Sequence, residues 1–218
     1  MKKHILTAAI LSIAFSISAS AQSMVRNSSK TTFGIRAGVN FQNINGKDAG
    51  DDDLEFDILT GYHAGLNAEI PIGSGFYVQP GVLYSLKGAK PSDDSKIKLS
   101  YVEVPVNFVY KPVVGTGNMV LGFGPYVGFA VDGKIKVPGG ELDIDFDEDY
   151  NALNPQSYFK RFDAGANFLA GYEFTPKISI QLNAQLGLVN INKENPADND
   201  DDTRWRNTGF GVSLGYRF

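Results

Sequence analysis

A regular alternation of apolar and polar residues runs through most of the chain after residue 32. Because successive side chains of an extended strand point to opposite faces, a period of two gives each face its own residue set. In residues 33–41 every odd position is Phe, Ile, Ala or Val, and every even position is Gly, Arg or Asn. Seven further segments follow the same rule, at residues 62–70, 76–87, 101–110, 119–129, 161–174, 178–188 and 207–218. The pattern predicts an all-β protein with eight strands.

The distribution of glycines and acidic residues shows that the two faces meet different environments. None of the 24 glycines and none of the 24 acidic residues lies on the apolar face of these segments. Twenty of the acids fall in the connections 42–60, 88–96, 132–157 and 192–204. A soluble sandwich or lipocalin-like barrel is the alternative, but its polar face would meet water and carry many charges. A polar face with few charges and many glycines favours a crowded lumen, with the apolar face turned outward to lipid.

The connections between the segments alternate in length. Residues 71–75, 111–118 and 175–177 form short turns containing Pro or Gly, whereas the other four connections are longer and polar. Short turns at one end, long loops at the other and strands of about 10 residues are the signature of a transmembrane β-barrel. Closure of the sheet would also satisfy every backbone group in hydrocarbon. We therefore predict an eight-stranded antiparallel transmembrane β-barrel over residues 32–218, with short periplasmic turns and long acidic extracellular loops.

Two local features add expectations about strand shape. Pro80, Pro105 and Pro125 each remove a hydrogen-bond donor from the ladder, so we expect bulges or strand ends there. In residues 142–147 apolar residues alternate with Asp, so we expect the flanking strands to continue above the membrane as a hairpin.

The first 21 residues indicate export from the cytoplasm. Lys2 and Lys3 form a basic start, residues 5–17 are mainly apolar, and Ala19-Ser20-Ala21 resembles a cleavage site. We interpret residues 1–21 as a cleaved signal peptide and 22–31 as a short periplasmic segment. No later apolar run approaches the roughly 20 residues of a spanning helix, so we expect an integral barrel of a bacterial outer membrane. The absence of Cys excludes disulfides. With an acidic pI of about 5.2, the chain lacks the excess of positive charge that is typical of nucleic-acid-binding proteins.

Several sequence motifs resemble the PorT-like outer-membrane β-barrel family. They are Gln22 after the signal peptide, FGIRAG at 33–38, YVEVPV at 101–106, GFGPYVG at 122–128 and FDAG at 162–165. The resemblance covers nearly all of the mature chain and implies an eight-stranded outer-membrane barrel. For the namesake of the family it implies a part in protein secretion and export to the cell surface. That role does not follow from the fold alone, because fold and function separate readily.

The sequence offers little support for catalysis, a cofactor or a metal. His63 is the only His of the mature chain, and Asp163 and Ser85 share its face, but no nucleophile or metal-helix motif is present. We therefore expect His63 to be a hydrogen-bonded packing residue and the protein not to be an enzyme. The acidic clusters 51–53, 143–149 and 198–202 suggest a calcium site, but none has the spacing of a twelve-residue calcium loop, so we expect solvated loops.

The few charged residues on the polar face predict a network inside the barrel. They are Arg36, Glu69, Glu173 and Arg217 toward the periplasmic end, Lys87, Arg161 and Asp163 toward the outer end, and Glu103 between. Opposite signs share each level, and an eight-stranded barrel is just wide enough for its own side chains. We therefore expect a plug of ion pairs rather than a conducting pore, since an unpaired charge there would be costly. Individually solvated charges are the alternative.

The last strand carries a possible assembly signal. Phe218 closes an apolar stripe that includes Tyr216, and a terminal aromatic residue resembles the signal read by the outer-membrane insertion machinery. The alternative is that Phe218 is one aromatic residue of the membrane girdle. Three functions stay open at this point: an interaction barrel at the surface, a component of a secretion apparatus, and a small-solute channel. The expected partners are outer-membrane lipid, the insertion machinery, and secretion-system or surface proteins.

Overall fold

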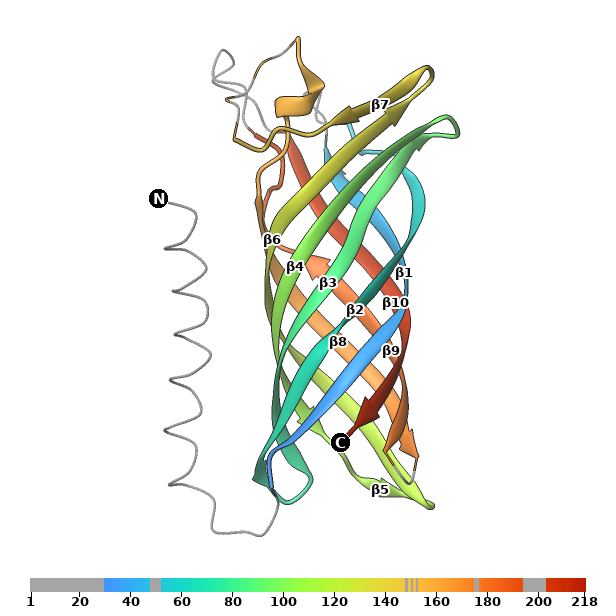
Figure 1. The fold of residues 1–218 in the computed structure, drawn as a ribbon, viewed down its shortest axis with the longest axis vertical. Coiled ribbons are helices and arrows are strands. Elements are labelled where there is room, and N and C mark those ends of the chain that lie inside the picture. The colour runs from blue at the N-terminus through green and yellow to red at the C-terminus, as the bar shows by residue number, and fades with distance from the viewer. Residues whose placement is uncertain are drawn as a thin grey trace.

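The computed structural model describes residues 30–47, 52–147, 149, 151, 153–174, 177–193 and 203–218. The predicted signal peptide and nearly all of the segment 22–31 lie outside these residues. Eight long strands dominate (Figure 1): β1 (Thr32–Lys47), β2 (Asp57–Gly73), β3 (Phe76–Ser92), β4 (Ser95–Tyr110), β6 (Gly117–Val137), β8 (Phe162–Phe174), β9 (Ile178–Gly187) and β10 (Arg204–Arg217). The short elements are β5 (Val113–Val114), β7 (Gly140–Asp143) and a 3-10 turn, η2 (Pro155–Ser157). In the described part of the chain, no helix is long and apolar enough to cross a membrane.

The eight long strands form a closed antiparallel barrel, as predicted. Each pairs with the next long strand in the chain, and β1 also pairs with β10, from Gly34 opposite Arg217 to Lys47 opposite Arg204. One end of the barrel, here called the turn end, carries the short β2–β3, β4–β6 and β8–β9 connections and the C-terminus (Figure 1). The opposite end, called the loop end, carries the other connections.

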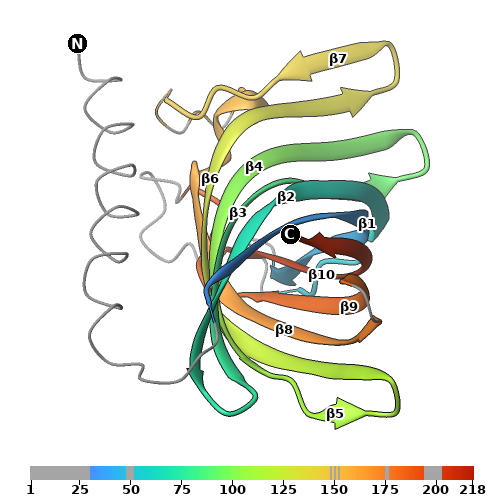
Figure 2. The same ribbon diagram turned by 60° about the horizontal axis from the view of Figure 1, so that its bottom comes forward.

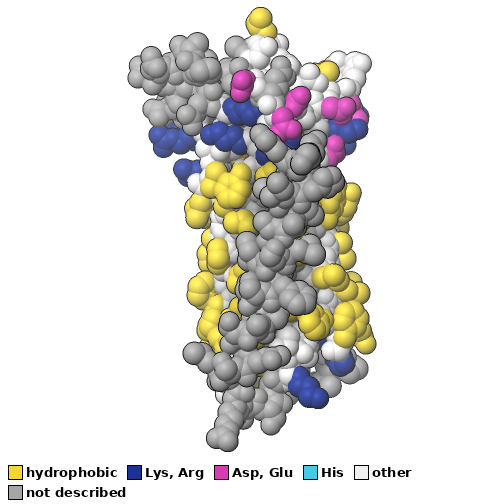
Figure 3. Space-filling view, turned by 60° about the vertical axis from the view of Figure 1, so that its left-hand side comes forward, with side chains coloured by type: hydrophobic (Ala, Val, Ile, Leu, Met, Phe, Trp, Pro, Cys, Tyr) yellow, Lys and Arg dark blue, Asp and Glu magenta, His cyan; other side chains and the backbone are white. Residues whose placement is uncertain are grey.

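The predicted faces of the strands are confirmed. Outward side chains are apolar and exposed, such as Leu182 at 60% and Leu214 at 62%, whereas the inward Asn40 is 1% exposed. Figure 3 shows hydrophobic side chains along the middle height of the visible barrel wall. On β6 this belt of apolar side chains runs from Met119 to Val131. Twelve residues at about 3.3 Å each, on a strand tilted by about 40°, span about 30 Å, which is about the thickness of the hydrocarbon core of a bilayer.

The predicted bulges or strand ends at Pro80, Pro105 and Pro125 are wrong. Pro80 lies within β3 opposite Val106, and the same register continues from Leu83 opposite Glu103. Pro125 likewise lies within β6, where β6 pairs continuously with β8. The ladder tolerates a missing N–H donor without a shift of register, because the rest of each long strand holds the pairing.

Several strands run further at the loop end than the sequence predicted. The expected connection 88–96 shrinks to a turn at Asp93 and Asp94, because β3 and β4 continue on either side of it. The hairpin expected from residues 142–147 forms only in part: β6 folds back on the short β7, with Lys134 opposite Asp143, whereas residues 144–147 are not in a strand. Figure 2 shows both hairpins projecting beyond the barrel wall.

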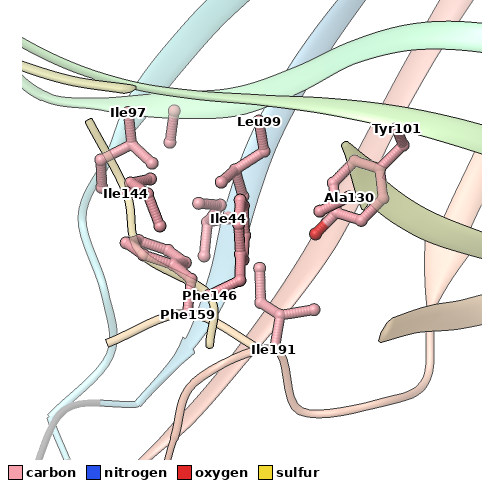
Figure 4. Close-up of a cluster of buried hydrophobic side chains, with 10 residues drawn as sticks. Ile44, Ile97, Leu99, Tyr101, Ala130, Ile144, Phe146, Phe159 and Ile191 are labelled. Carbon is pink, nitrogen blue, oxygen red and sulfur yellow. The ribbon is translucent and has the colours of Figure 1, made fainter. Parts of the chain in front are cut away.

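An apolar cluster fills the interior of this extended part (Figure 4). We call it the cap, and its buried members are Ile44, Ala89, Ile97, Leu99, Tyr101, Ala130, Ile144, Phe146, Phe159 and Ile191. Gly133 leaves the space that the cap needs, since a Cβ atom there would lie 2.9 Å from Phe146 and 3.0 Å from Ile144. Backbone hydrogen bonds tie the incoming loops together, with Ile191 N donating to Trp205 O at 2.8 Å. The loop end is therefore a folded structure with its own apolar core.

Candidate functional site: the lumen

A buried ion-pair group lies at the lumen level next to the cap. Lys87 Nζ lies 2.5 Å from Glu103 Oε1 and 3.1 Å from Asp163 Oδ2, and all three side chains are at most 3% exposed. They come from β3, β4 and β8, so the group spans the barrel interior. We call these three residues the Lys87 group. It contains two carboxylates and one ammonium, and a buried group of this kind persists only with further donors.

Neighbouring side chains supply those donors and shield the group. Asn207 Nδ2 and the Tyr126 hydroxyl donate to Asp163 Oδ2 at 3.0 and 3.3 Å, and Gln185 Nε2 donates to Glu103 Oε2 at 3.0 Å. The Lys87 ammonium also lies 4.3 Å from the centre of the Tyr126 ring, within cation–π range. The group is thus held by contacts from several strands.

A second ion-pair group lies near the turn end. Lys111 Nζ lies 2.6 Å from Glu69 Oε1 and 2.7 Å from Glu173 Oε2. Arg217 Nη2 lies 2.6 Å from Glu69 and 3.0 Å from Glu173, so two cations and two carboxylates alternate in a ring. We call these four residues the turn-end group. Gln79 Nε2 adds a hydrogen bond of 3.0 Å to Glu69 Oε1.

Lys111 is the member that the sequence analysis missed. It was assigned to a turn because Pro112 and Gly115 follow it. Yet Lys111 continues the odd-numbered inward positions of β4, which include Glu103 and Asn107. Following the alternation one step past the last residue of the strand would have identified it.

Arg161 does not belong to the lumen network, contrary to the prediction. Its Nη2 lies 2.8 Å from Asp147 Oδ2 in the loop, its side chain is 29% exposed, and it stacks on the Phe146 ring at 5.0 Å. Arg161 precedes the first residue of β8, Phe162, where the chain bends. Side chains alternate between the two faces only within a strand. Extending the alternation from Phe162 back to Arg161 therefore wrongly predicted that the Arg161 side chain points into the lumen.

Arg36 lies in the lumen but joins neither ion-pair group. Its Nη1 donates a long hydrogen bond of 3.4 Å to Gln181 Oε1, and its buried Nε has no hydrogen-bond partner among the described residues. Two small cavities, of about 10 and 20 Å³, border it. Each holds about one or two water molecules, because one water needs roughly 10–15 Å³. The interior at this level is filled by side chains.

His63 is part of a hydrogen-bonded chain. Its Nε2 lies 2.8 Å from Ser213 Oγ, and Ser213 donates its hydroxyl proton to Asn183 Oδ1 at 3.0 Å. Ser213 must therefore accept from His63, whereas a serine nucleophile would donate its proton to the histidine. Ser85 and Asp163 share the face of His63 but bond elsewhere. Ser85 accepts a hydrogen bond from Asn40 at 3.4 Å, and Asp163 belongs to the Lys87 group.

The acidic clusters give no metal geometry in the described residues. No group of three or more His, Cys, Asp or Glu side chains within that part of the chain is placed to hold a metal ion. Asp51 and the cluster 198–202 lie outside the described residues.

A search of solved structures finds weak similarity to three proteins among others. Neisserial surface protein A is 10% identical with a TM-score of 0.49, Ail of Yersinia pestis bound to sucrose octasulfate is 13% identical with a TM-score of 0.44, and a major outer membrane protein of Thermus thermophilus is 14% identical with a TM-score of 0.44. Each comparison covers 87% of this chain and 100% of the other. No curated protein matches the chain.

A family model identifies the chain more directly. The model described as "Outer membrane protein beta-barrel domain" matches residues 20–193. Together with the closed barrel and its apolar belt, this match makes the protein an integral protein of the outer membrane. The chain therefore belongs to the outer membrane protein beta-barrel domain family.

Proposed function

We propose that this protein is a non-enzymatic closed barrel that holds a folded loop end at the cell surface for interaction with other proteins. The observation that carries the proposal is the filled lumen, with the Lys87 group at most 3% exposed. A small-solute channel, the alternative, needs a continuous water path. Cavities of about 10 and 20 Å³ favour the closed barrel over that alternative.

The form of the loop end supports an interaction role. The cap gives the loops a rigid base, since Phe159 and Ile191 are at most 1% exposed. Acidic residues lie further out, including Asp93 and Asp94 at the tip of the β3–β4 hairpin. A partner would meet two projecting hairpins and an acidic rim at fixed positions.

This proposal requires the loop end to face outward. A cysteine in place of Asp94 should react with a membrane-impermeant reagent in intact cells, whereas one in place of Ser74, at the turn end, should react only after lysis. Both residues lie in tight exposed turns, so they form a matched pair. Equal labelling of both in intact cells would contradict the orientation.

The resemblance to the PorT-like family extends the proposal to protein secretion or export. That role is tested by deleting the gene that encodes the protein and then surveying the proteins exported to the cell surface. We expect specific exported proteins to be lost from the surface. Pull-down from detergent-solubilised membranes tests physical association with a secretion apparatus. An unchanged set of surface proteins would contradict the export role. The role as an interaction barrel would then stand alone.

We also propose that Phe218 is read by the insertion machinery. Phe218 is 58% exposed on the outer face and packs edge-on against Tyr216, with ring centres 5.7 Å apart. Phe174, 46% exposed, packs against Tyr172 at 4.9 Å, which makes it a matched control. Deletion of Phe218 should leave the chain degraded or periplasmic, while Phe174→Ala still inserts. Equal amounts of heat-modifiable barrel from both variants would contradict the signal.

A further inference from the structure

Basic side chains form a band outside the barrel, directly beyond the apolar belt at the loop end (Figure 3). On the barrel strands beyond the belt, the outward basic residues are Lys47, Lys90, Lys96, Lys98, Lys134, Lys136, Arg204 and Arg206. The acidic residues described on the same stretches are Asp57 and Asp132. The inward partners of the band, such as Ile97 and Leu99, pack into the cap, which fixes the lysines outward. Cations are therefore in excess on this ring.

The strand register places two pairs of these cations directly opposite each other. The pairs are Lys96 with Lys136 and Lys98 with Lys134. Like charges directly opposite on neighbouring strands destabilise a sheet, because the side chains lie about 5 Å apart. Such an arrangement is favourable only where an anion neutralises both members.

Acidic residues of the chain neutralise the β4–β6 part of the band only weakly. Glu141 on β7 lies 4.0 Å from Lys98 and 3.9 Å from Lys134, and Asp143 lies 3.8 Å from Lys134. These distances are at the outer limit of an ion pair, and the side chains are 38–83% exposed. Exposed pairs of this kind contribute little. Asp57 stands opposite Lys90 and Asp132 precedes Lys134 by two residues, which still leaves the excess of cations.

The position of the band relative to the membrane indicates which anion it can bind. Lys98 lies four residues beyond the last exposed apolar residue of the β4 belt, Val102, or about 10 Å along the membrane normal on a strand tilted by about 40°. Headgroups occupy about 5–8 Å beyond the hydrocarbon, and flexible lysine side chains reach back across the remaining distance. Clustered Lys and Arg at this level bind anionic headgroups.

We propose that this basic band binds the phosphate groups of outer-leaflet lipid, of which bisphosphorylated lipid A is the probe. Each opposed pair of cations would share one phosphate, whose oxygens accept hydrogen bonds from both side chains. The acyl chains of the same lipid would then lie against the apolar belt below. The band would thereby fix the depth of the barrel in the membrane.

The test measures retention of lipid A by the full-length mature barrel purified in detergent. The wild-type protein should retain bisphosphorylated lipid A at least about tenfold better than dephosphorylated lipid A. The variant Lys98→Gln/Lys134→Gln should lose most of that preference, and Lys98→Arg/Lys134→Arg should keep it. Lys177→Gln, an exposed lysine at the turn end, is the matched control and should behave like wild type. The assignment to the outer leaflet rests on the orientation proposed above. Retention of lipid A in detergent does not depend on that orientation, so the two proposals can fail separately.

Three results would overturn the proposal. The first is equal retention of the phosphorylated and dephosphorylated lipid by the wild type, which needs no variant to fold. The second is full retention by a heat-modifiable Lys98→Gln/Lys134→Gln barrel. The third is equally strong binding of a soluble sulfated polysaccharide, lost in the same variant, which would identify a soluble polyanion instead of lipid as the ligand.

Discussion

The interior of the barrel is built differently at two heights. At membrane height the inward residues are polar, as with Asn40 at 1% exposure on β1. Four residues further along the same face, Ile44 at 0% exposure belongs to the apolar cap. The outer face changes in the opposite sense, from belt residues such as Phe41 to Asn45 and Lys47. The same alternation thus reverses its phase where the surroundings change from lipid to water.

The reversal follows from where apolar surface can be buried. In lipid, outward apolar side chains need no burial, so the inside can hold hydrogen-bonded polar groups. In water, apolar area must be removed from solvent at about 25 cal/mol per Å², so it turns inward. Each half of the molecule therefore uses the interior that its surroundings permit.

The largest expected effect comes from breaking the polar interior. Lys87→Met leaves Glu103 and Asp163 buried without their ammonium partner, since both ion pairs run to Lys87. We expect the free energy of unfolding to fall by about 3–5 kcal/mol. Urea titration in lipid vesicles, followed by heat-modifiable mobility, measures it. Lys177→Met, at an exposed turn, should change stability by about 0.5 kcal/mol or less.

Placing a polar side chain in the cap should cost slightly less. Ile44→Asn removes buried apolar surface and buries an amide among side chains such as Leu99 and Phe159, for a loss of about 3–4 kcal/mol. Trp205, the single Trp of the chain, packs against the cap and reports its unfolding by fluorescence. Ile44→Val is the control, expected at about 1 kcal/mol. An equally small loss for Ile44→Asn would mean that the cap is not a packed core.

The outer face offers the same comparison with one substitution at two heights. Leu182→Arg places a charge in the lipid belt near mid-strand of β9, for an expected loss of about 2–4 kcal/mol. Leu142→Arg on β7, 37% exposed above the belt, should cost about 0.5 kcal/mol or less. Urea titration in vesicles separates the two. Similar losses at both positions would mean that no boundary between lipid and water lies between them.

The smallest effect is expected at Arg161. Its ion pair with Asp147 is partly exposed, with side-chain exposures of 29% and 76%. Arg161→Gln should therefore lower the free energy of unfolding by about 1 kcal/mol or less, by the magnitudes of exposed pairs. If Arg161→Gln lowered the free energy of unfolding as much as Lys87→Met, Arg161 would have to belong to a buried ion-pair group.

The sequence was sufficient for the barrel and its faces because alternation is a local signal that every strand repeats. It also identified Lys87, Glu103 and Asp163 as lumen charges. It could not identify their partners, because pairing across the lumen depends on strand register and tilt. The sequence does not predict the cap, because Leu99 and Tyr101 are inward and apolar there, and a phase reversal of this kind looks like the end of a strand pattern. Lys111 and Arg161 were misassigned at strand ends, where the alternation stops or bends.

Electrical conductance across a planar bilayer tests the central claim, that ion pairs and side chains close the interior at membrane height. The wild-type barrel, folded and heat-modifiable, should give no steady current above the bare bilayer, because ion pairs and side chains fill the lumen and the two cavities beside Arg36 are only about 10 and 20 Å³. A refolded porin under the same conditions shows that insertion and detection work. Discrete, stable openings from the wild-type barrel would contradict the closed interior and identify a channel instead.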